Sequence, residues 1–258
     1  MTESLQTETK IYSALAEVYD SLMDDVNYEL WADFIDEILM VHHPEPVHLL
    51  ELACGTGSMA LSLEELECYE ITATDASESM IRKAREKAIK HHSKISFEVM
   101  DFLSIDLDGK FDAVIMAFDS INYLHQKEQI LTLMGQVKKV LKPEGIFIFD
   151  FTTPRNSVKS IRYLHKEEGS DGSRFRYSRT SRYNHKLKIH TNDFLIKEVD
   201  EKNQSKNIFR ESHKQKIYTL KQMKEIIGDT DFKILATYDG FQLKPAKNRS
   251  LRITMVLK

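Results

Sequence analysis

Two glycines, Gly55 and Gly57, directly follow an apolar run that contains Glu51 near its end. A second apolar run ends at Asp75, eighteen residues beyond Gly57. This order predicts a strand, a tight loop, a helix, a second strand and an acid. In such a unit the backbone approaches an adenosine-type ligand closely, and the carboxylate accepts hydrogen bonds from the ribose hydroxyls. We therefore expect an enzyme that uses a nucleoside cofactor.

The same residues also allow a rival interpretation. Gly55, Gly57 and Ala60 satisfy the glycine fingerprint of nicotinamide cofactors, in which Asp75 would hold the adenosine ribose. That fingerprint is weak by itself. The acid Glu51 before the loop, two helices before the first strand and a helix–strand–strand ending all argue against it.

Alternating helical periodicities and apolar runs position this loop. We expect helices over 11–24, 28–41, 58–66, 77–91 and 126–141, and strands over 47–52, 69–74, 95–99, 111–117 and 146–151. Strands that alternate with helices imply a parallel sheet with right-handed crossovers.

The pattern changes after Pro154. Residues 155–216 show no helical periodicity, and their alternation predicts antiparallel strands. A helix over 219–227 and strands over 232–238 and 250–257 then resume the earlier rhythm. We predict a cofactor-binding domain of residues 1–153 and 217–258. The β-rich insertion, 154–216, would cap the site, bind substrate or mediate oligomerisation.

Composition excludes several classes of protein. The 258 residues carry a net charge of −4 and two cysteines, so neither a disulfide framework nor global nucleic-acid binding is indicated. No apolar run approaches the ~20 residues that cross a bilayer, and the polar start of the chain is unlike a secretory signal. The histidines have no metal-ligand spacing. We expect a cytoplasmic protein without a metal or a membrane partner.

These motifs, in this order, resemble the class I S-adenosylmethionine-dependent methyltransferases. The stretch 51–57 resembles the cofactor motif of that family, and Asp75 resembles its acid after strand two. Further similar segments are Asp101-Phe102, 111–116 and 141–145. The resemblance covers about 11–153 and 217–258. It is closest to small bacterial methyltransferases that carry a β-rich insertion after strand five.

The resemblance implies an α/β, Rossmann-like class I methyltransferase fold. Its mostly parallel seven-stranded sheet would have an antiparallel last strand, and a small antiparallel β insertion would be added. The implied cofactor is S-adenosyl-L-methionine. Its binding residues would be Glu51, Ala53, Gly55, Gly57, Asp75, Ala76, Met80, Asp101, Phe102 and Phe118. Two structural alternatives stay open, since Asp75 could cap the following helix and Met80 could be ordinary core.

The acceptor side of the site is less sharply indicated. Asp119 and Tyr19 are the catalytic candidates, with Asp119 orienting the acceptor or taking its proton. The substrate-binding candidates are Tyr19, Trp31, Asp119, Asn122 and Tyr123. The alternatives are a surface turn after strand four and an N-terminal lid that merely packs. His213 is a weaker candidate for a base, and Cys54 is interpreted as a packed side chain.

The leading functional hypothesis is methyl transfer to a small-molecule acceptor, with N-methylation slightly favoured. The insertion carries about sixteen Lys and Arg against about eight Asp and Glu, so an RNA methyltransferase is the first alternative. We favour a solvated sheet face or an oligomer surface, including a homodimer, over RNA binding. The second alternative is a non-catalytic module that binds S-adenosylmethionine.

Overall fold

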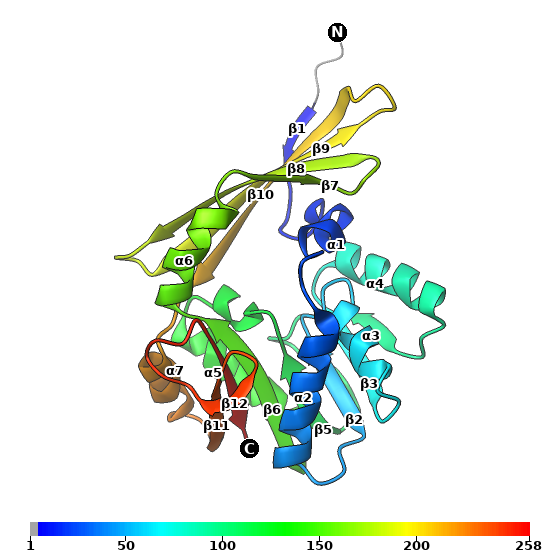
Figure 1. Ribbon diagram of the computed structural model, residues 1–258. Helices are drawn as coiled ribbons and strands as arrows, with labels where there is room; N and C mark the ends of the chain where they lie inside the picture. The colour runs from blue at the N-terminus through cyan, green and yellow to red at the C-terminus, as the bar shows by residue number, and fades with distance from the viewer. Residues whose placement is uncertain (1–4) are drawn as a thin grey trace.

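The computed structural model describes residues 5–258, and its centre is an eight-stranded sheet (Figure 1). In spatial order the strands are β12 (Gln242–Pro245), β11 (Ile234–Asp239), β13 (Arg252–Leu257), β6 (Leu141–Thr152), β5 (Phe111–Met116), β2 (His48–Leu52), β3 (Glu70–Asp75) and β4 (Ser96–Val99). The pairs from β6 to β4 are parallel, whereas β13 runs antiparallel to both β6 and β11. The predicted fold class is confirmed, and β12 adds one edge strand to the seven expected.

Helices cover both faces of this sheet and make it a three-layer structure. One face packs against α2 (Tyr28–His42), α3 (Ser58–Glu64) and α4 (Glu78–His91). The other face packs against α5 (Lys127–Val140) and α7 (Leu220–Ile227). Side-chain caps set several helix starts: Asn27, Ser77 and Thr219 each accept a hydrogen bond from a backbone N–H in the first turn.

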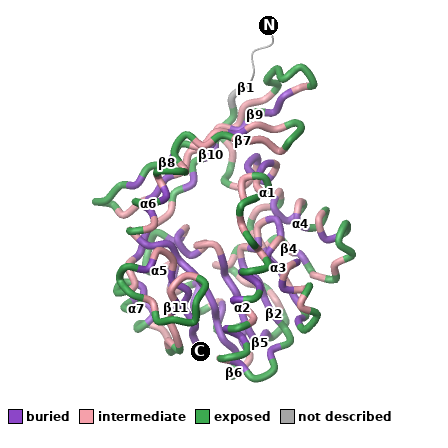
Figure 2. The backbone as a smooth tube through the Cα atoms, viewed as in Figure 1, coloured by how far each residue is buried: buried purple, intermediate pink, exposed green. Residues whose placement is uncertain are grey.

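The middle strands are buried on both faces, which explains their continuous apolar runs (Figure 2). Every residue of β5 is buried, and Phe147, Phe149 and Phe151 of β6 are among the largest fully buried side chains. Burial of this kind stabilises the sheet by about 25 cal/mol per Å² of apolar surface. The parallel strands therefore form a rigid floor for the residues at their carboxyl ends.

A second, five-stranded sheet lies at the top of Figure 1. Its spatial order is β1 (Leu5–Glu8), β10 (Ser205–Lys216), β9 (Ile189–Val199), β8 (Phe175–Asn184) and β7 (Glu167–Ser170). All of its pairs are antiparallel except β1, which runs parallel to β10. Apolar side chains of β8 and β9 pack against Ala14, Leu15 and Val18, so this sheet holds the segment after β1.

Four local expectations differ from the structure. A helix, α6 (Pro154–Leu164), occupies a stretch where only strands were predicted. The expected helix over 11–24 is two short pieces, η1 (Leu15–Glu17) and α1 (Tyr19–Leu22). Strand β1 was not foreseen. Strand β6 starts at Leu141 rather than at Ile146, with a register shift opposite Phe111 and Ala113.

Backbone conformation explains one of these differences, and side-chain burial explains another. Tyr12 has φ +61°, in the left-handed region, so a regular helix cannot run through it. The buried face of α6 carries Ser157 and Ser160, while Val158 and Tyr163 are exposed. Apolar periodicity therefore does not mark the side of α6 that packs.

Across the described residues 5–258, none of the helices has the length and apolar character required to span a bilayer. Within that same range, no three His, Cys, Asp or Glu side chains come together in a way that could hold a metal ion.

Candidate functional site

A cavity of about 740 Å³ lies at the carboxyl ends of β2, β3 and β5, where open α/β sheets bind ligands. The loops after these strands and residues 10–13 of the N-terminal segment line it. Nine of the ten predicted cofactor residues line it: Glu51, Ala53, Gly55, Asp75, Ala76, Met80, Asp101, Phe102 and Phe118. The topology thus gathers residues from four separate loops around one space.

In the loop after β2, every second residue from Ala53 to Gly57 has a left-handed backbone conformation. Ala53, Gly55 and Gly57 all have positive φ, at +55°, +57° and +77°. Left-handed residues at every second position turn the chain sharply. The N–H groups of Cys54, Gly55 and Gly57 are bonded to Thr74 O, Asp75 Oδ2 and Cys54 O, so the turn is fixed by the protein itself. Asp20 of α1 ties this loop down, because it accepts hydrogen bonds from Thr56 Oγ1 at 2.6 Å and from Lys87 Nζ at 2.9 Å.

Gly57 has a packing role rather than a place in the cavity wall. It precedes α3, and a Cβ atom there would lie 2.6 Å from the ring of Phe97 and 3.1 Å from Ala84. Gly57 is thus the one predicted cofactor residue outside the cavity lining, and its missing side chain makes room for β4 and α4.

We expect Gly57→Ala to lower the free energy of unfolding by about 1–3 kcal/mol, since it combines a clash with an unfavourable φ. Gly135→Ala is the matched control, because Gly135 lies in the middle of α5 with no atom near its Cβ position. That control should raise stability by about 0.5–1 kcal/mol. Urea unfolding of both variants measures the difference; equal effects would refute the packing role.

Asp75 ends β3 with both carboxylate oxygens directed by the backbone. Oδ2 accepts the Gly55 N–H at 2.9 Å, and Oδ1 accepts the Ser77 N–H at 2.8 Å. Burial raises the pKa of Asp75, and these two hydrogen bonds oppose the shift. The cap of α4 is Ser77 rather than Asp75. Each oxygen of Asp75 therefore has a free lone pair for a ligand.

Glu51 is the other carboxylate of the cavity wall, and it is only 2 % exposed. Its Oε2 is buried without a hydrogen-bond partner. Burial, and then the nearby Asp75, raise the pKa of Glu51 to about 8. A buried acceptor of this kind is costly, and a cationic ligand in the cavity would satisfy it.

The remaining side chains form the walls at either end. Met80 is buried in the first turn of α4, and Asp101 accepts the Leu103 N–H at 2.8 Å through Oδ1. Phe118 has φ +58° and packs against Trp31 and Tyr28, with ring centroids 4.5 Å and 5.4 Å away. These contacts give the cavity apolar sides suited to a flat ring.

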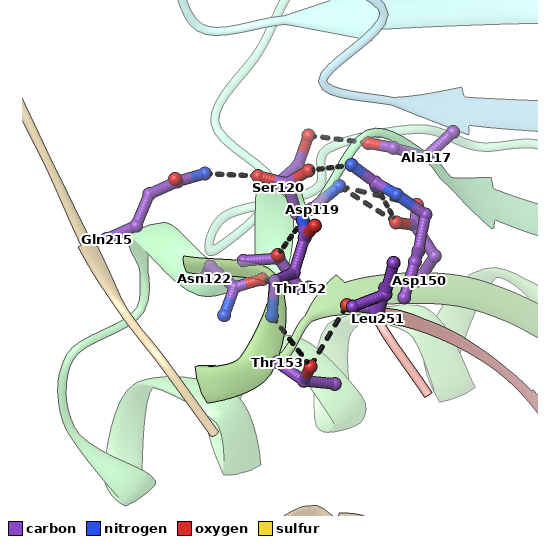
Figure 3. A network of polar contacts seen from close by, with 11 residues as sticks. Ala117, Asp119, Ser120, Asn122, Asp150, Thr152, Thr153, Gln215 and Leu251 are labelled. Atoms are coloured by element: carbon purple, nitrogen blue, oxygen red, sulfur yellow. Dashed lines mark hydrogen bonds and ion pairs between the residues drawn. The ribbon is translucent and has the colours of Figure 1, made fainter. Parts of the chain in front are cut away.

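Asp119 does not fit the catalytic role predicted for it. It lies outside the cavity lining and has φ +52°. Its backbone N–H donates to the carboxylate of Asp150 (Figure 3), and Arg252 pairs with both carboxylates. Oδ1 of Asp119 is bound by Arg252 Nη2 at 2.5 Å, and Oδ2 accepts from Gln215 Nε2 at 2.5 Å. Both carboxylate oxygens of Asp119 are therefore engaged by other residues of the protein and face away from an acceptor in the cavity. Its role is to hold the loop after β5 to β10 and β13.

Asn122 and Trp31 also lie outside the cavity, contrary to their prediction as substrate-binding residues. Asn122 is fully buried and donates to the Lys216 carbonyl at 2.6 Å. Its Oδ1 accepts the Thr152 N–H at 3.0 Å (Figure 3). Its amide thus joins η2 (Ser120–Tyr123) to β6 and β10. Trp31 lies behind Phe118 and supports it. Of the predicted acceptor-side residues, Tyr19 and Tyr123 do line the cavity.

Sequence reasoning missed several residues of the wall, chiefly Tyr12, Tyr28 and Ser77. Tyr12 and Tyr28 lie in the N-terminal segments from which only Tyr19 and Trp31 were predicted as substrate-binding residues. No motif marks them. A cluster of tyrosines in the first thirty residues, namely Tyr12, Tyr19 and Tyr28, is the one signal that could have pointed to them.

Comparison with known proteins agrees with this geometry. Residues 49–145 match the family described as "Methyltransferase domain". These residues are a methyltransferase domain. The domain includes the glycine loop, Asp75 and Asp101, so the family predicted from the motifs is confirmed for it.

One curated protein is similar to this chain in sequence, and two solved structures are similar to it in fold. The Bacillus subtilis (strain 168) protein named "Putative methyltransferase YqeM" is 40% identical over 141 residues, which are 54% of this chain and 55% of that protein. A S-adenosylmethionine-dependent methyltransferase from Clostridium acetobutylicum ATCC 824 aligns with a TM-score of 0.76 at 24% identity, over 96% of this chain and 98% of the other. The sugar N-methyltransferase KedS8 from Streptoalloteichus sp ATCC 53650 aligns with a TM-score of 0.71 at 16% identity, over 93% and 92%.

The two structural alignments show that the class I methyltransferase fold extends over nearly the whole chain, insertion included. By sequence, the chain spans about half the length of the curated relatives that it matches first, 55% and 56%.

The residues of the methyltransferase domain fit S-adenosylmethionine, the cofactor of this family. That cofactor carries an ammonium, a ribose and an adenine. The unpaired Oε2 of Glu51 suits the ammonium, the free lone pairs of Asp75 suit the ribose hydroxyls, and Asp101 suits the adenine amino group.

Glu51 should make cofactor affinity depend on pH. Its pKa of about 8 means that the carboxyl carries a proton at neutral pH, and pairing with an ammonium requires that proton to leave. The association constant for S-adenosylmethionine should therefore rise with pH up to about pH 8, by as much as about tenfold per unit. Calorimetry between pH 6 and pH 8 measures this rise, and Glu51→Gln should flatten it. A slope that persists in Glu51→Gln would assign the titration to another group.

Proposed function

We propose that this protein transfers the methyl group of S-adenosylmethionine to a small-molecule acceptor, with an amine nitrogen favoured as the methylated atom. One observation supports the proposal above all. Within a methyltransferase domain, one cavity is lined by the buried Glu51, whose Oε2 has no hydrogen-bond partner, by Asp75, which is fixed by backbone N–H groups, and by the glycine loop after β2.

The chemistry needs little from the protein beyond placement. The bound cofactor supplies an electrophilic methyl group on its sulfonium. Glu51 would hold the ammonium of the cofactor and Asp75 its ribose, and the loop from Ala53 to Thr56 would shape the space between them. The acceptor must be aligned with the methyl group at near-attack distance. Tyr12 and Tyr19 of the N-terminal segment and Tyr123 of η2 are the cavity residues that we assign to this alignment.

The preference for nitrogen rests on the kind of wall that faces the acceptor. The three tyrosines offer hydroxyl oxygens that can accept from an N–H group, and the similar structure KedS8 is titled a sugar N-methyltransferase. An amino sugar or a comparable polar amine is the acceptor class that these features support.

The RNA alternative rests on the positive charge of the insertion, and ion pairs in the structure reduce that charge. Arg174, Arg179 and Arg182 of the insertion form ion pairs with Glu198, Glu167 and Asp193. Part of the positive charge counted in the sequence is therefore neutralised within the sheet. A strip of unpaired cations would be needed to follow a phosphate backbone.

Two measurements test the proposal in sequence. Calorimetry should detect binding of S-adenosylmethionine and S-adenosylhomocysteine. Formation of S-adenosylhomocysteine should then be followed with a panel of primary amines that includes amino pentoses and amino hexoses, alongside structured RNA. Absence of binding to both ligands by the folded protein would reject the function. Binding without turnover of any acceptor would favour the non-catalytic module, and salt-sensitive turnover of RNA alone would favour the RNA alternative.

We also propose, on the sequence expectations, a cytoplasmic location and a homodimer formed through the insertion. Light scattering tests the homodimer, since a monomeric mass at micromolar concentration would exclude it.

A further inference from the structure

We propose that Glu211, His213 and Tyr123 form a directed hydrogen-bond relay that makes the hydroxyl of Tyr12 a proton acceptor at the cavity wall. The inference rests on the proposed function and deepens it, since it names the group that receives the proton of the acceptor. Tyr12 would be the catalytic residue, and the other three would be positioning residues behind it.

The far end of the relay can only accept hydrogen bonds. The side chain of Glu211 is fully buried, and it accepts the backbone N–H groups of Tyr12 and Ala14 at 2.7 Å and of Leu15 at 3.0 Å. All three contacts are donated by backbone N–H groups, so both oxygens of Glu211 act in them as acceptors. Glu211 therefore anchors the N-terminal segment and presents a negative charge to His213.

That charge fixes the tautomer of His213. Nε2 lies 3.1 Å from Glu211 Oε2, so this nitrogen carries the hydrogen and donates it. In the neutral ring Nδ1 is then a bare acceptor, 3.1 Å from the hydroxyl of Tyr123. The rings of Tyr12 and Phe194 hold the imidazole edge-on, with centroids 4.6 Å and 5.3 Å away.

The direction continues to the cavity. Because Tyr123 donates to His213, its oxygen must accept from Tyr12 in the 2.6 Å contact between the two hydroxyls. Tyr12 thus donates its only hydroxyl proton to Tyr123, and its oxygen keeps a free lone pair. Both tyrosines line the cavity. The donors and acceptors of all four residues are consistent with one direction.

The protein holds Tyr12 in a strained conformation at this point. Its φ of +61° is unfavourable for a tyrosine. Glu211 accepts the backbone N–H of Tyr12, and the carbonyl of Tyr12 accepts from Ser77 Oγ at 2.7 Å. Strain that is held by a buried carboxylate and by the cap of α4 is typical of a functional position.

The proton balance is simple. The nitrogen lone pair of the acceptor forms the new N–CH₃ bond, and the electrons of the S–CH₃ bond stay on sulfur. The nitrogen proton passes to Tyr12 as the proton of Tyr12 passes to Tyr123 and that of Tyr123 to His213 Nδ1. The product is an imidazolium beside Glu211. Burial raises the pKa of both Tyr12 and Tyr123, so each phenol keeps a hydroxyl proton and gives it up only as it receives another.

The groups that face His213 are few. They are Glu211 on β10, Tyr12 on the N-terminal segment, Tyr123 on η2 and the uncharged Phe194 on β9. Asp119 adds a negative charge that acts on both tyrosines. Glu211 is therefore the charged group in direct contact with the ring.

The first test reads the tautomer in the ligand-free protein by ¹⁵N NMR of its histidines, with His213→Gln to assign the signal. We expect a hydrogen on Nε2 and none on Nδ1 in the neutral ring, and a shift of the Nδ1 signal in Tyr123→Phe. A hydrogen on Nδ1, or an Nδ1 signal that ignores Tyr123→Phe, would overturn the relay. This readout needs no methyl acceptor.

The second test uses turnover of the amine panel. Tyr12→Phe, Tyr123→Phe and His213→Gln should each lower kcat by about 10²-fold and remove the acidic limb of its pH profile, with the KM for S-adenosylmethionine within about threefold. The double variant Tyr123→Phe/His213→Gln should be no slower than either single one, because one relay is broken once. Tyr183→Phe is the control, since its buried hydroxyl has no partner.

A merely structural role predicts a different result: a raised KM, a lower melting temperature and an unchanged pH profile. That outcome would also overturn the relay. If the cofactor binds but no amine is methylated, the proposed function fails, while the NMR result still decides the relay.

Discussion

Asp75→Ala is expected to weaken binding of S-adenosylmethionine at least about 100-fold. Two charge-assisted hydrogen bonds to the ribose would be lost, at about 1.5–3 kcal/mol each. The N–H groups of Gly55 and Ser77 would also lose the oxygens that direct them. Asp75→Asn should have an intermediate effect, because it keeps one oxygen. Calorimetry with S-adenosylhomocysteine measures the change without turnover.

Glu70→Gln is the control for Asp75, since Glu70 begins the same strand and its side chain is exposed. It should leave the dissociation constant unchanged within about twofold. If Asp75→Ala bound as tightly as the wild type, Asp75 would be only a structural brace of the loop, and the cofactor site would have to be placed elsewhere.

Arg252→Met is expected to lower the free energy of unfolding by about 3–5 kcal/mol, because it leaves buried carboxylates uncompensated. Arg252 forms ion pairs with Asp119 and with Asp150, whose side chain is 1 % exposed. Burial raises the pKa of Asp150 to about 6 even though Arg252 opposes the shift. Burial alone would lower the pKa of Arg252, but the two carboxylates raise it.

Two comparisons sharpen this prediction. The loss should shrink below about pH 6, since Asp150 then takes up a proton and needs no counter-charge. Arg252→Met/Asp150→Asn should recover part of the stability for the same reason. Arg82→Met is the control, because Arg82 pairs with Glu17 and Glu86 on the surface and should cost less than about 1 kcal/mol. Equal losses for Arg82 and Arg252 in urea unfolding would contradict the buried network.

The Arg252 network also shows why the acceptor side was harder to predict than the cofactor side. Asp119 is an acidic residue shortly after a buried strand. Asp75 has the same local pattern, and its side chain does line the cavity. The side chain of Asp119 nevertheless turns to Arg252, 133 residues later in the chain. The local pattern of Asp119 contains no information about that partner.

The amino-acid sequence by itself determined the α/β fold and the positions of the glycine loop and Asp75 at the carboxyl ends of two strands. These features depend on short-range rules: apolar periodicity, positive φ at glycine and the position of an acid at the end of a strand. The tertiary structure decided the rest. It brought Tyr12 within hydrogen-bond reach of Glu211, 199 residues away, and it buried a serine face of α6 that no apolar pattern marks. Long-range contacts of polar side chains leave no periodic trace in a single sequence, because one residue at each end is enough to make them.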